Sequence, residues 1–334
     1  MYKLYSATVE LTRKCNARCK HCIVDALYAK ENEMTTERIL SLIEELHDEG
    51  CGTITLTGGE PFLREEWPLF VQKAYALNMQ IVMMSNGLKI DEPIIKVLKL
   101  FNVALGISLD GCDAETHDKI RGVRGIFDNF VKLIPKLKEA GIYVAIPTTV
   151  MKSNFDQLDK IRDLLIDLKV DAWQLQVVKP SGRLENDDEI LTEEQYYKLA
   201  EKIVEYRRDF GDKLSITEAD CIGYNSVLTP GLGIQEWRGC ECGIYSVSIE
   251  SDGNVKGCPN MNNSEGNVSE RPFKEIWQSH DSFKYNRMPN PENLIGFCRE
   301  CEHRYVCRGG CPTNPRTDKN VYCLHKIETV GVDK

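Results

Sequence analysis

Three cysteines near the start of the chain have the spacing of metal ligands. They follow one another as Cys15-x3-Cys19-x2-Cys22. Thiolates are the usual ligands of iron–sulfur clusters, and this short spacing lets one loop hold three irons of a four-iron cube. The loop has no fourth cysteine, so one iron is left open to another molecule, as a catalytic metal requires. Zinc is the alternative, although zinc sites usually use two separated cysteine pairs.

A second and larger set of cysteines lies in the last third of the chain. Nine of the 14 cysteines fall between residues 221 and 323. The N-terminus has no basic stretch leading into an apolar secretory segment, and the cytosol keeps thiols reduced, so disulfides are not expected. We therefore expect a cytoplasmic protein whose cysteines bind metal or act in catalysis. A zinc ribbon would explain Cys298, Cys301, Cys307 and Cys311 taken alone, but not the whole set.

The first two thirds of the chain alternate between short apolar runs and amphipathic stretches. Each run is short enough to be a buried strand, and strands that alternate with helices predict a parallel sheet. Six strands are too few for a closed eight-stranded barrel. The predicted fold is therefore α/β, a partial (β/α)6 barrel of the TIM type with its working residues at the C-terminal ends of the strands. The runs comprise residues 5–11, 53–57, 80–84, 103–109, 142–150 and 172–178.

Helix signals lie between these runs. Thr192 and Gln195 have the spacing of a capping box that opens a helix. Another predicted helix presents one apolar face, formed by Ile39, Leu42, Ile43 and Leu46.

The character of the chain changes after about residue 212. Residues 179–190 are polar and acidic and contain Pro and Gly, which is typical of a linker. Beyond about residue 212 the strand–helix alternation fades and cysteines accumulate, so metal sites are expected to stabilise the fold there. We expect a barrel domain over residues 1–212 and a small cysteine-rich domain over residues 213–334.

Charge and hydropathy exclude two classes of protein. The net charge is −9 and the isoelectric point is about 5.4, which argues against a nucleic-acid binder because such proteins need a basic face. No apolar run approaches the roughly 18 residues that a membrane span requires. We therefore expect neither a nucleic-acid partner nor a membrane partner.

The first cysteine motif, CNARCKHC at residues 15–22, resembles the signature of the radical S-adenosylmethionine (SAM) superfamily. In that family the open iron of a [4Fe-4S] cluster binds the amino and carboxylate groups of SAM. Reductive cleavage of SAM then yields a 5′-deoxyadenosyl radical, which abstracts a hydrogen atom from the substrate. The resemblance implies that this cluster and SAM are cofactors, and that flavodoxin or ferredoxin is the electron donor.

Further motifs follow the predicted strands in the order that the resemblance implies. Residues 58–61 resemble the family's GGEP motif, which holds the SAM amino group, and two glycines let backbone carbonyls approach an ammonium closely. Residues 85–87 and 108–111 follow the next two strands. Arg121 lies in a stretch similar to one in peptide-modifying members, and either positions an anionic group or belongs to a helix-end charge network. The implied SAM contacts are Gly58, Gly59, Glu60, Pro61, Ser85, Asn86, Ser108, Asp110 and Thr148.

The C-terminal cysteines resemble the seven-cysteine SPASM pattern, which holds two auxiliary [4Fe-4S] clusters. By this resemblance a distal cluster would use Cys298, Cys301, Cys307 and Cys323. The proximal cluster would use Cys240, Cys242, Cys258 and Cys311. Two ligands in Cys-x-Cys spacing on one cluster are tight, so Cys221 is an alternative ligand, or the proximal cluster keeps an open iron.

Cys221 and Asp220 are candidate catalytic residues just before the auxiliary region. A thiol is a good hydrogen-atom donor, so Cys221 could quench a substrate radical and give epimerisation. Asp220 could act as the base that deprotonates such a radical.

The resemblance implies modification of a ribosomally made peptide or protein by crosslinking, epimerisation or oxidation. Because Cys15 lies so near the start, there is no room before it for a leader-binding domain, so a separate leader-binding protein is expected if the substrate is a peptide. The alternative is a small-molecule enzyme, such as a tetrapyrrole side-chain modifier or an aminoglycoside or sugar epimerase. Sulfatase maturation is disfavoured because Ile23 and Val24 stand where that subgroup has an aromatic pair. A non-catalytic electron carrier is disfavoured because a carrier needs no SAM-binding motifs.

Overall fold

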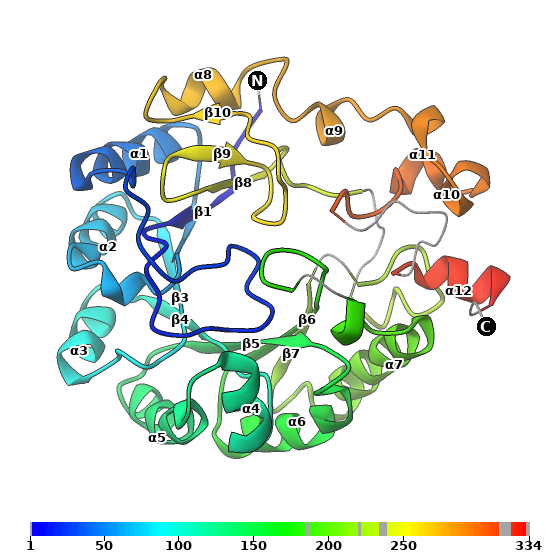
Figure 1. Cartoon of the computed structure of the whole chain (residues 1–334), viewed down its shortest axis with the longest axis horizontal. Helices are drawn as coiled ribbons and strands as arrows, with labels where there is room; N and C mark the ends of the chain where they lie inside the picture. Colours follow the sequence, from blue (N-terminus) through cyan, green and yellow to red (C-terminus); the bar gives the residue numbers. More distant parts are fainter. Residues whose placement is uncertain (1, 185–186, 220–221, 234–238, 314–321, 332–334) are drawn as a thin grey trace.

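The computed structural model describes residues 2–184, 187–219, 222–233, 239–313 and 322–331. All six predicted strands are present and lie side by side in one parallel sheet (Figure 1). They are β1 (Ser6–Glu10), β2 (Thr53–Thr57), β3 (Gln80–Ser85), β4 (Ala104–Ile107), β5 (Val144–Val150) and β6 (Ala172–Val177). The expected partial barrel is therefore confirmed.

Four further strands extend the sheet at both edges. β7 (Ser215–Glu218) pairs parallel with β6, and β8 (Ser246–Ile249) pairs parallel with β1. β9 (Asn254–Lys256) and β10 (Gly266–Asn267) then continue antiparallel from β8. Within the described residues the sheet order runs from β10 to β7 without closing, so the barrel stays open.

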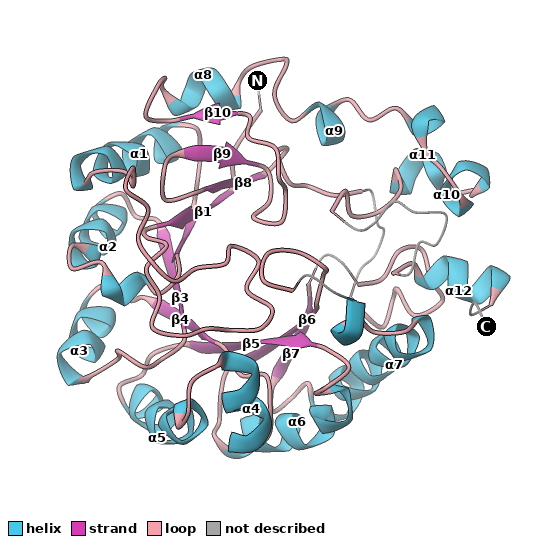
Figure 2. Cartoon of the chain, in the orientation of Figure 1, coloured by secondary structure: helices cyan, strands magenta, loops and turns pink. Residues whose placement is uncertain are grey.

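Helices form a layer outside the curved sheet, as Figure 2 shows. The larger ones are α1 (Thr36–Asp48), α2 (Trp67–Ala76), α3 (Glu92–Leu100), α4 (Ala114–Arg121), α5 (Ile126–Glu139), α6 (Leu158–Asp167) and α7 (Glu193–Phe210). Short helices follow in the C-terminal region, namely α8 (Phe273–Trp277), α9 (Lys284–Arg287), α10 (Phe297–Glu300), α11 (Arg304–Cys307) and α12 (Leu324–Val330). Single 3-10 turns occur at η1 (Pro61–Leu63), η2 (Phe155–Gln157), η3 (Asp187–Glu189) and η4 (Pro291–Asn293).

Local sequence signals explain where the helices begin and which face they bury. The side chain of Thr35 accepts a hydrogen bond from the Arg38 N–H and starts α1. The predicted apolar face of α1 is buried against the sheet, and it consists of Ile39, Leu42, Ile43 and Leu46. α7 begins with the predicted capping box of Thr192 and Gln195.

The two predicted domains share this sheet, because β7 and β8 come from residues 213–334 and flank strands of residues 1–212. A division of the chain at residue 212 stays a prediction. No helix in the described part of the chain is long and apolar enough to cross a bilayer.

Candidate active site

A cavity of about 770 Å³ lies inside the open barrel at the C-terminal ends of the strands. Side chains alternate across a strand, so every second residue faces the cavity. On β5, for example, Ala145, Pro147 and Thr149 line it. Its walls also include seven cysteines, Cys15, Cys19, Cys22, Cys240, Cys242, Cys258 and Cys311.

Cys15, Cys19 and Cys22 lie on the loop that follows β1, and the end of α4 holds this loop in place. The backbone N–H of Arg18 donates to the carbonyl of Arg121 at 3.0 Å, and that of Lys20 donates to Ile120 at 2.8 Å. The loop crosses the centre of the barrel mouth (Figure 1).

The environment of the three thiols fits an iron–sulfur cluster. Each sulfur faces an N–H donor: Ala17 N lies 3.4 Å from Cys15 Sγ, Ala26 N lies 3.4 Å from Cys22 Sγ, and Arg121 Nη1 lies 3.6 Å from Cys19 Sγ. Burial, with smaller contributions from neighbouring acidic groups and thiols, raises the pKa of Cys15 to about 11. Bound iron would compensate the charge of three adjacent thiolates, while the N–H donors stabilise the sulfurs.

Gly58 and Gly59 line the cavity and let two chain segments approach closely. A Cβ at Gly59 would lie 2.5 Å from the carbonyl oxygen of Lys14 and 2.8 Å from Cys15 Cβ. A Cβ at Gly58 would lie 2.5 Å from the carbonyl oxygen of Thr12. The glycines therefore place the backbone of the GGEP segment directly against the cysteine loop.

Glu60 lies beneath the cavity wall and is fully buried. Its carboxylate accepts hydrogen bonds from Ser85 Oγ at 2.8 Å and from the Asn86 N–H at 2.9 Å. Burial raises the pKa of Glu60 to about 7. Ser85 and Asn86 line the cavity, whereas Glu60 supports them from behind, and Pro61 is buried at the start of η1.

Ser108 lines the cavity after β4, but Asp110 does not reach it. The carboxylate of Asp110 is enclosed by Arg121 Nη2 at 2.7 Å, His21 Nε2 at 2.9 Å and the Thr149 N–H at 2.8 Å. Burial alone would raise the pKa of Asp110, but the charges of Arg121 and His21 outweigh it and hold this pKa well below its usual range. Asp110 was expected to contact SAM. In the structure it lies behind the cavity wall instead, where it holds Arg121 and His21 in place.

Thr148 is likewise turned away from the cavity. Its hydroxyl donates to the carbonyl of Leu109 at 2.7 Å and accepts from Trp173 Nε1 at 2.8 Å. The pleat of β5 puts the next residue, Thr149, on the inner wall. Thr148 therefore does not line the cavity, contrary to the expectation that it contacts SAM, because the alternation of side chains along β5 turns it to the other face.

The proximal set of cysteines lies on the same cavity as the first three. Cys242 hydrogen-bonds both Cys240 and Cys258, and the bond from Cys242 lowers the pKa of Cys258 to about 6. Cys311 Sγ accepts from Lys179 Nζ at 3.1 Å. Four thiols that line one cavity, with a lysine donor at Cys311, fit the proximal cluster, and the Cys-x-Cys pair lies together there.

The distal set gathers outside the cavity around α10, α11 and the start of α12. Burial, followed by the charges of the other thiols of this set, raises the pKa of Cys307 to about 11 and that of Cys323 to about 12. The thiols of this set act on one another's pKa, so they lie within electrostatic reach of one another. They are Cys298, Cys301, Cys307 and Cys323.

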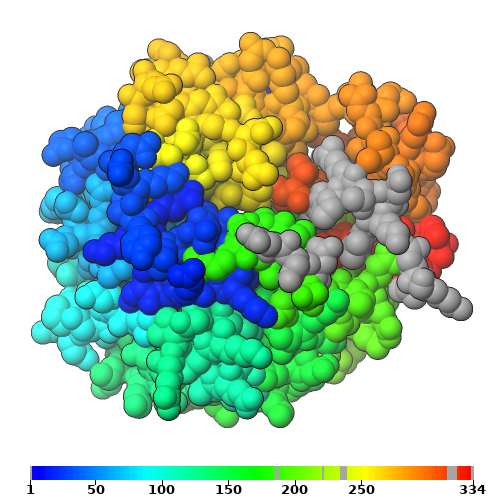
Figure 3. Space-filling model, viewed as in Figure 1, coloured from blue at the N-terminus to red at the C-terminus, as the bar shows by residue number. Residues whose placement is uncertain are grey.

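The segment expected to be a linker is instead packed against the first cysteine loop. Arg183 Nη1 donates to the carbonyl of Cys19 at 2.7 Å, and its Nη2 donates to that of Ala26 at 2.8 Å. Gly182, at φ +63°, approaches so closely that a Cβ would lie 2.2 Å from the Cys22 carbonyl oxygen. In Figure 3 this green segment and the blue loop meet at the centre of the face.

Cys221 and Asp220 lie outside the described residues, so their catalytic roles stay predictions. Their neighbour Ala219 lines the cavity.

Several cavity residues were not singled out from the sequence. Glu10, at the end of β1, is buried, lines the cavity and pairs with Arg13. Burial raises the pKa of Glu10 to about 7, although Arg13 lowers it in part. Glu250 lines the same wall and pairs with Arg13 at 2.9 Å. The available signal for Glu10 was its place two positions after Thr8, on the same face of the strand.

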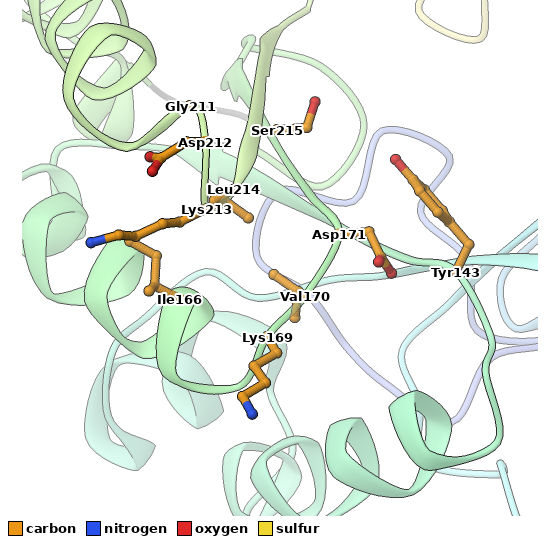
Figure 4. A pocket seen from close by; sticks show the side chains of 10 residues that line it. All are labelled: Tyr143, Ile166, Lys169, Val170, Asp171, Gly211, Asp212, Lys213, Leu214 and Ser215. Carbon is orange, nitrogen blue, oxygen red and sulfur yellow. The ribbon is translucent and has the colours of Figure 1, made fainter.

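A second hollow, of about 640 Å³, lies at the opposite ends of the strands (Figure 4). Residues at or just before the starts of β5, β6 and β7 line it, among them Tyr143, Asp171 and Ser215. It contains none of the cysteines or motif residues, so we place the chemistry in the barrel cavity.

An open parallel barrel with a three-cysteine loop at its mouth defines a class of SAM-dependent iron–sulfur enzymes. The family model for the radical SAM superfamily matches residues 9–165, and the SPASM model, an iron–sulfur cluster-binding domain, matches residues 240–302. The chain is 31% identical over 318 residues to the AdoMet-dependent heme synthase of Oleidesulfovibrio alaskensis, covering 90% of this chain and 81% of that protein. This chain therefore belongs to the radical SAM superfamily and carries a SPASM domain.

Other relatives cover most of the chain as well. The AdoMet-dependent heme synthase of Methanosarcina barkeri is 29% identical over 337 residues, covering 95% of both proteins. The mycofactocin maturase MftC of Mycolicibacterium smegmatis is 30% identical over 312 residues, covering 91% of this chain and 77% of that protein. The structure of Streptococcus suis SuiB bound to its precursor peptide SuiA has the same fold, with a TM-score of 0.78, 16% identity, and coverage of 97% of this chain and 75% of that one. Membership implies a SAM-binding [4Fe-4S] cluster, SAM and auxiliary clusters as cofactors.

Proposed function

We propose that this protein is a radical SAM enzyme that oxidatively modifies a side chain of a tetrapyrrole. The observation that carries the oxidative part is the shared cavity, because the SAM-cluster cysteines and the proximal cysteines line the same space. A substrate bound between them can lose a hydrogen atom on one side and an electron on the other.

The bound cofactors supply reductive cleavage of SAM and a one-electron acceptor. The protein positions them: Glu60 orients Ser85 and Asn86, and Asp110 orients Arg121 beside Cys19. A substrate radical that gives up an electron must also release a proton or another leaving group. Glu10, buried on the cavity wall with a pKa of about 7, is the group we assign to accept a proton.

The substrate class comes from the relatives. Proteins named as heme synthases align with 90% and 95% of this chain at 31% and 29% identity. This reverses the order expected from the sequence, in which a peptide or protein substrate came first. Peptide modification is the second candidate, favoured by the relative named as a mycofactocin maturase and by a fold shared with SuiB, which was solved with a precursor peptide.

Several finer roles remain part of the proposal. Flavodoxin or ferredoxin is the proposed electron donor, and the cytoplasm the proposed location. A separate leader-binding protein is needed only for the peptide alternative. For the peptide alternative, Cys221 and Asp220 keep their proposed roles as hydrogen-atom donor and base.

The test measures 5′-deoxyadenosine formation by the anaerobically reconstituted enzyme with a chemical reductant. One arm receives no substrate, one receives carboxylate-bearing tetrapyrroles including iron-coproporphyrin III, and one receives a panel of short peptides. We expect a tetrapyrrole to accelerate SAM cleavage and to change in mass. The variant Cys15→Ala, which keeps the auxiliary cysteines, should lose both effects. A mass change in a peptide with every tetrapyrrole unaltered would overturn the proposed substrate class.

A further inference from the structure

Lys179 is a buried lysine at the junction between the barrel and the auxiliary region. It follows β6 after one residue, it is 8% exposed, and it lines the cavity. Its Nζ donates to Cys311 Sγ at 3.1 Å and to Thr313 Oγ1 at 2.7 Å. Lys179 therefore contacts one of the four proximal cysteines from the cavity side.

We infer that Lys179 is a positioning residue that raises the reduction potential of the cluster held by Cys240, Cys242, Cys258 and Cys311. The inference rests on the proposed use of these four cysteines as cluster ligands. Reduction adds one negative charge to a cluster. A cationic hydrogen-bond donor on a ligand sulfur stabilises the reduced form more than the oxidised form.

The surroundings make this effect strong and local. A charge-assisted bond in a buried site is weakly screened by water and salt. At Cys323 Sγ of the distal set, the donor is the backbone N–H of Lys326, at 3.4 Å. The side chain of Lys326 donates instead to Glu193 at 2.8 Å. The cationic donor at Cys311 is therefore expected to act chiefly on the potential of the proximal cluster.

Lys179 also begins the segment whose residue Arg183 binds the SAM-cluster loop. A more positive proximal potential makes that cluster the better acceptor for an electron leaving a substrate in the cavity. Lys179 thereby favours transfer of this electron to the proximal cluster over its return to the first cluster.

The experiment is a redox titration of the anaerobic, fully reconstituted enzyme, followed by electron paramagnetic resonance. The signal that changes when SAM is added identifies the first cluster, and the other two signals are compared between variants. We expect Lys179→Met to lower one auxiliary potential by at least about 59 mV, which corresponds to a tenfold change in the one-electron reduction equilibrium. Lys179→Arg, which keeps the charge and donors, should restore most of the shift, and Lys179→Gln should fall between them. Lys202→Met removes a lysine paired with Asp159 at 2.8 Å and should leave both auxiliary potentials unchanged.

The outcomes separate this inference from the proposed function. Unchanged potentials in Lys179→Met with both auxiliary clusters present would overturn the inference alone. Absence of a proximal cluster in the parent enzyme would overturn the ligand assignment on which it rests. If Lys179→Met loses iron, the comparison of Lys179→Arg with Lys179→Gln decides the question, and equal potentials in these two variants would refute a role of the charge.

Discussion

The Arg121 guanidinium joins Asp110 to Cys19, because its Nη2 lies 2.7 Å from Asp110 Oδ2 and its Nη1 lies 3.6 Å from Cys19 Sγ. The same Asp110 oxygen lies 2.9 Å from His21 Nε2, on the cysteine loop itself. One buried carboxylate thus holds two side chains at the site where the SAM cluster binds. Because Asp110 is fixed in the barrel, its pairing with Arg121 fixes the donor that faces Cys19, a proposed cluster ligand.

Removing this carboxylate is expected to destabilise the protein strongly. Asp110→Asn would leave the buried Arg121 charge without its anion, and breaking one partner of a buried pair costs about 3–5 kcal/mol. Denaturant unfolding of parent and variant at one pH measures the loss. Asp163→Asn, at an exposed ion pair with Arg162, should cost less than about 1 kcal/mol. Equal losses in the two variants would contradict the assigned role of Asp110.

Gly59 is expected to be essential for loading the first cluster. In Gly59→Ala the new methyl would meet the Lys14 carbonyl oxygen at 2.5 Å and displace the loop that carries Cys15. Iron per chain should fall by about four, the content of one cube, and SAM binding measured by calorimetry should be lost. Gly52→Ala is the matched control, because a Cβ there has nothing within 4 Å. Full iron content in Gly59→Ala would show that the loop tolerates the displacement.

Arg183 is expected to slow the loss of iron from the first cluster. Its side chain binds the carbonyls of Cys19 and Ala26, so Arg183→Ala frees one side of the loop. Loss of such supporting contacts typically weakens metal retention by about 10- to 100-fold. The rate of iron release to a ferrous chelator measures this. Arg208→Ala, which removes a surface pair with Asp209, should release iron at the parent rate, and the idea fails if Arg183→Ala does so too.

Glu10 predicts a specific pH dependence of stability. Its pKa is raised from 4.5 to about 7, chiefly by burial, so the folded protein keeps a proton that the unfolded chain releases near pH 4.5. The folded state then binds more protons between about pH 4.5 and 7, and stability falls as the pH rises through that window. Glu10→Gln should reduce this fall by roughly 3 kcal/mol between pH 4.5 and 7.5.

The check for Glu10 is denaturant unfolding across that pH range. Glu194→Gln serves as the comparison, since Glu194 is fully exposed and its pKa is lowered through its hydrogen bond with Lys198. The same pH slope in the parent and in Glu10→Gln would show that Glu10 does not titrate in this window.

Much of the barrel was predictable because its signals are local. The six apolar runs, the capping box at Thr192 and the apolar face of α1 each depend on residues a few positions apart. β7 and β8 were not predicted because polar side chains alternate with apolar ones in each four-residue strand, so no apolar run marks them. They exist because the edges of the six-stranded sheet offer unpaired backbone groups.

Residue types and their spacing along the chain are enough to show which thiols stand close enough to share a metal and which glycines let backbones approach. Which side chains reach the cavity depends on how the strands pack. The alternation of side chains along β5 places Thr149, and not Thr148, on the cavity wall. Asp110 pairs with Arg121 and His21 and does not line the cavity. The contact between Lys179 and Cys311 joins residues 132 positions apart, and such a pairing follows from the closure of the fold and not from any local pattern.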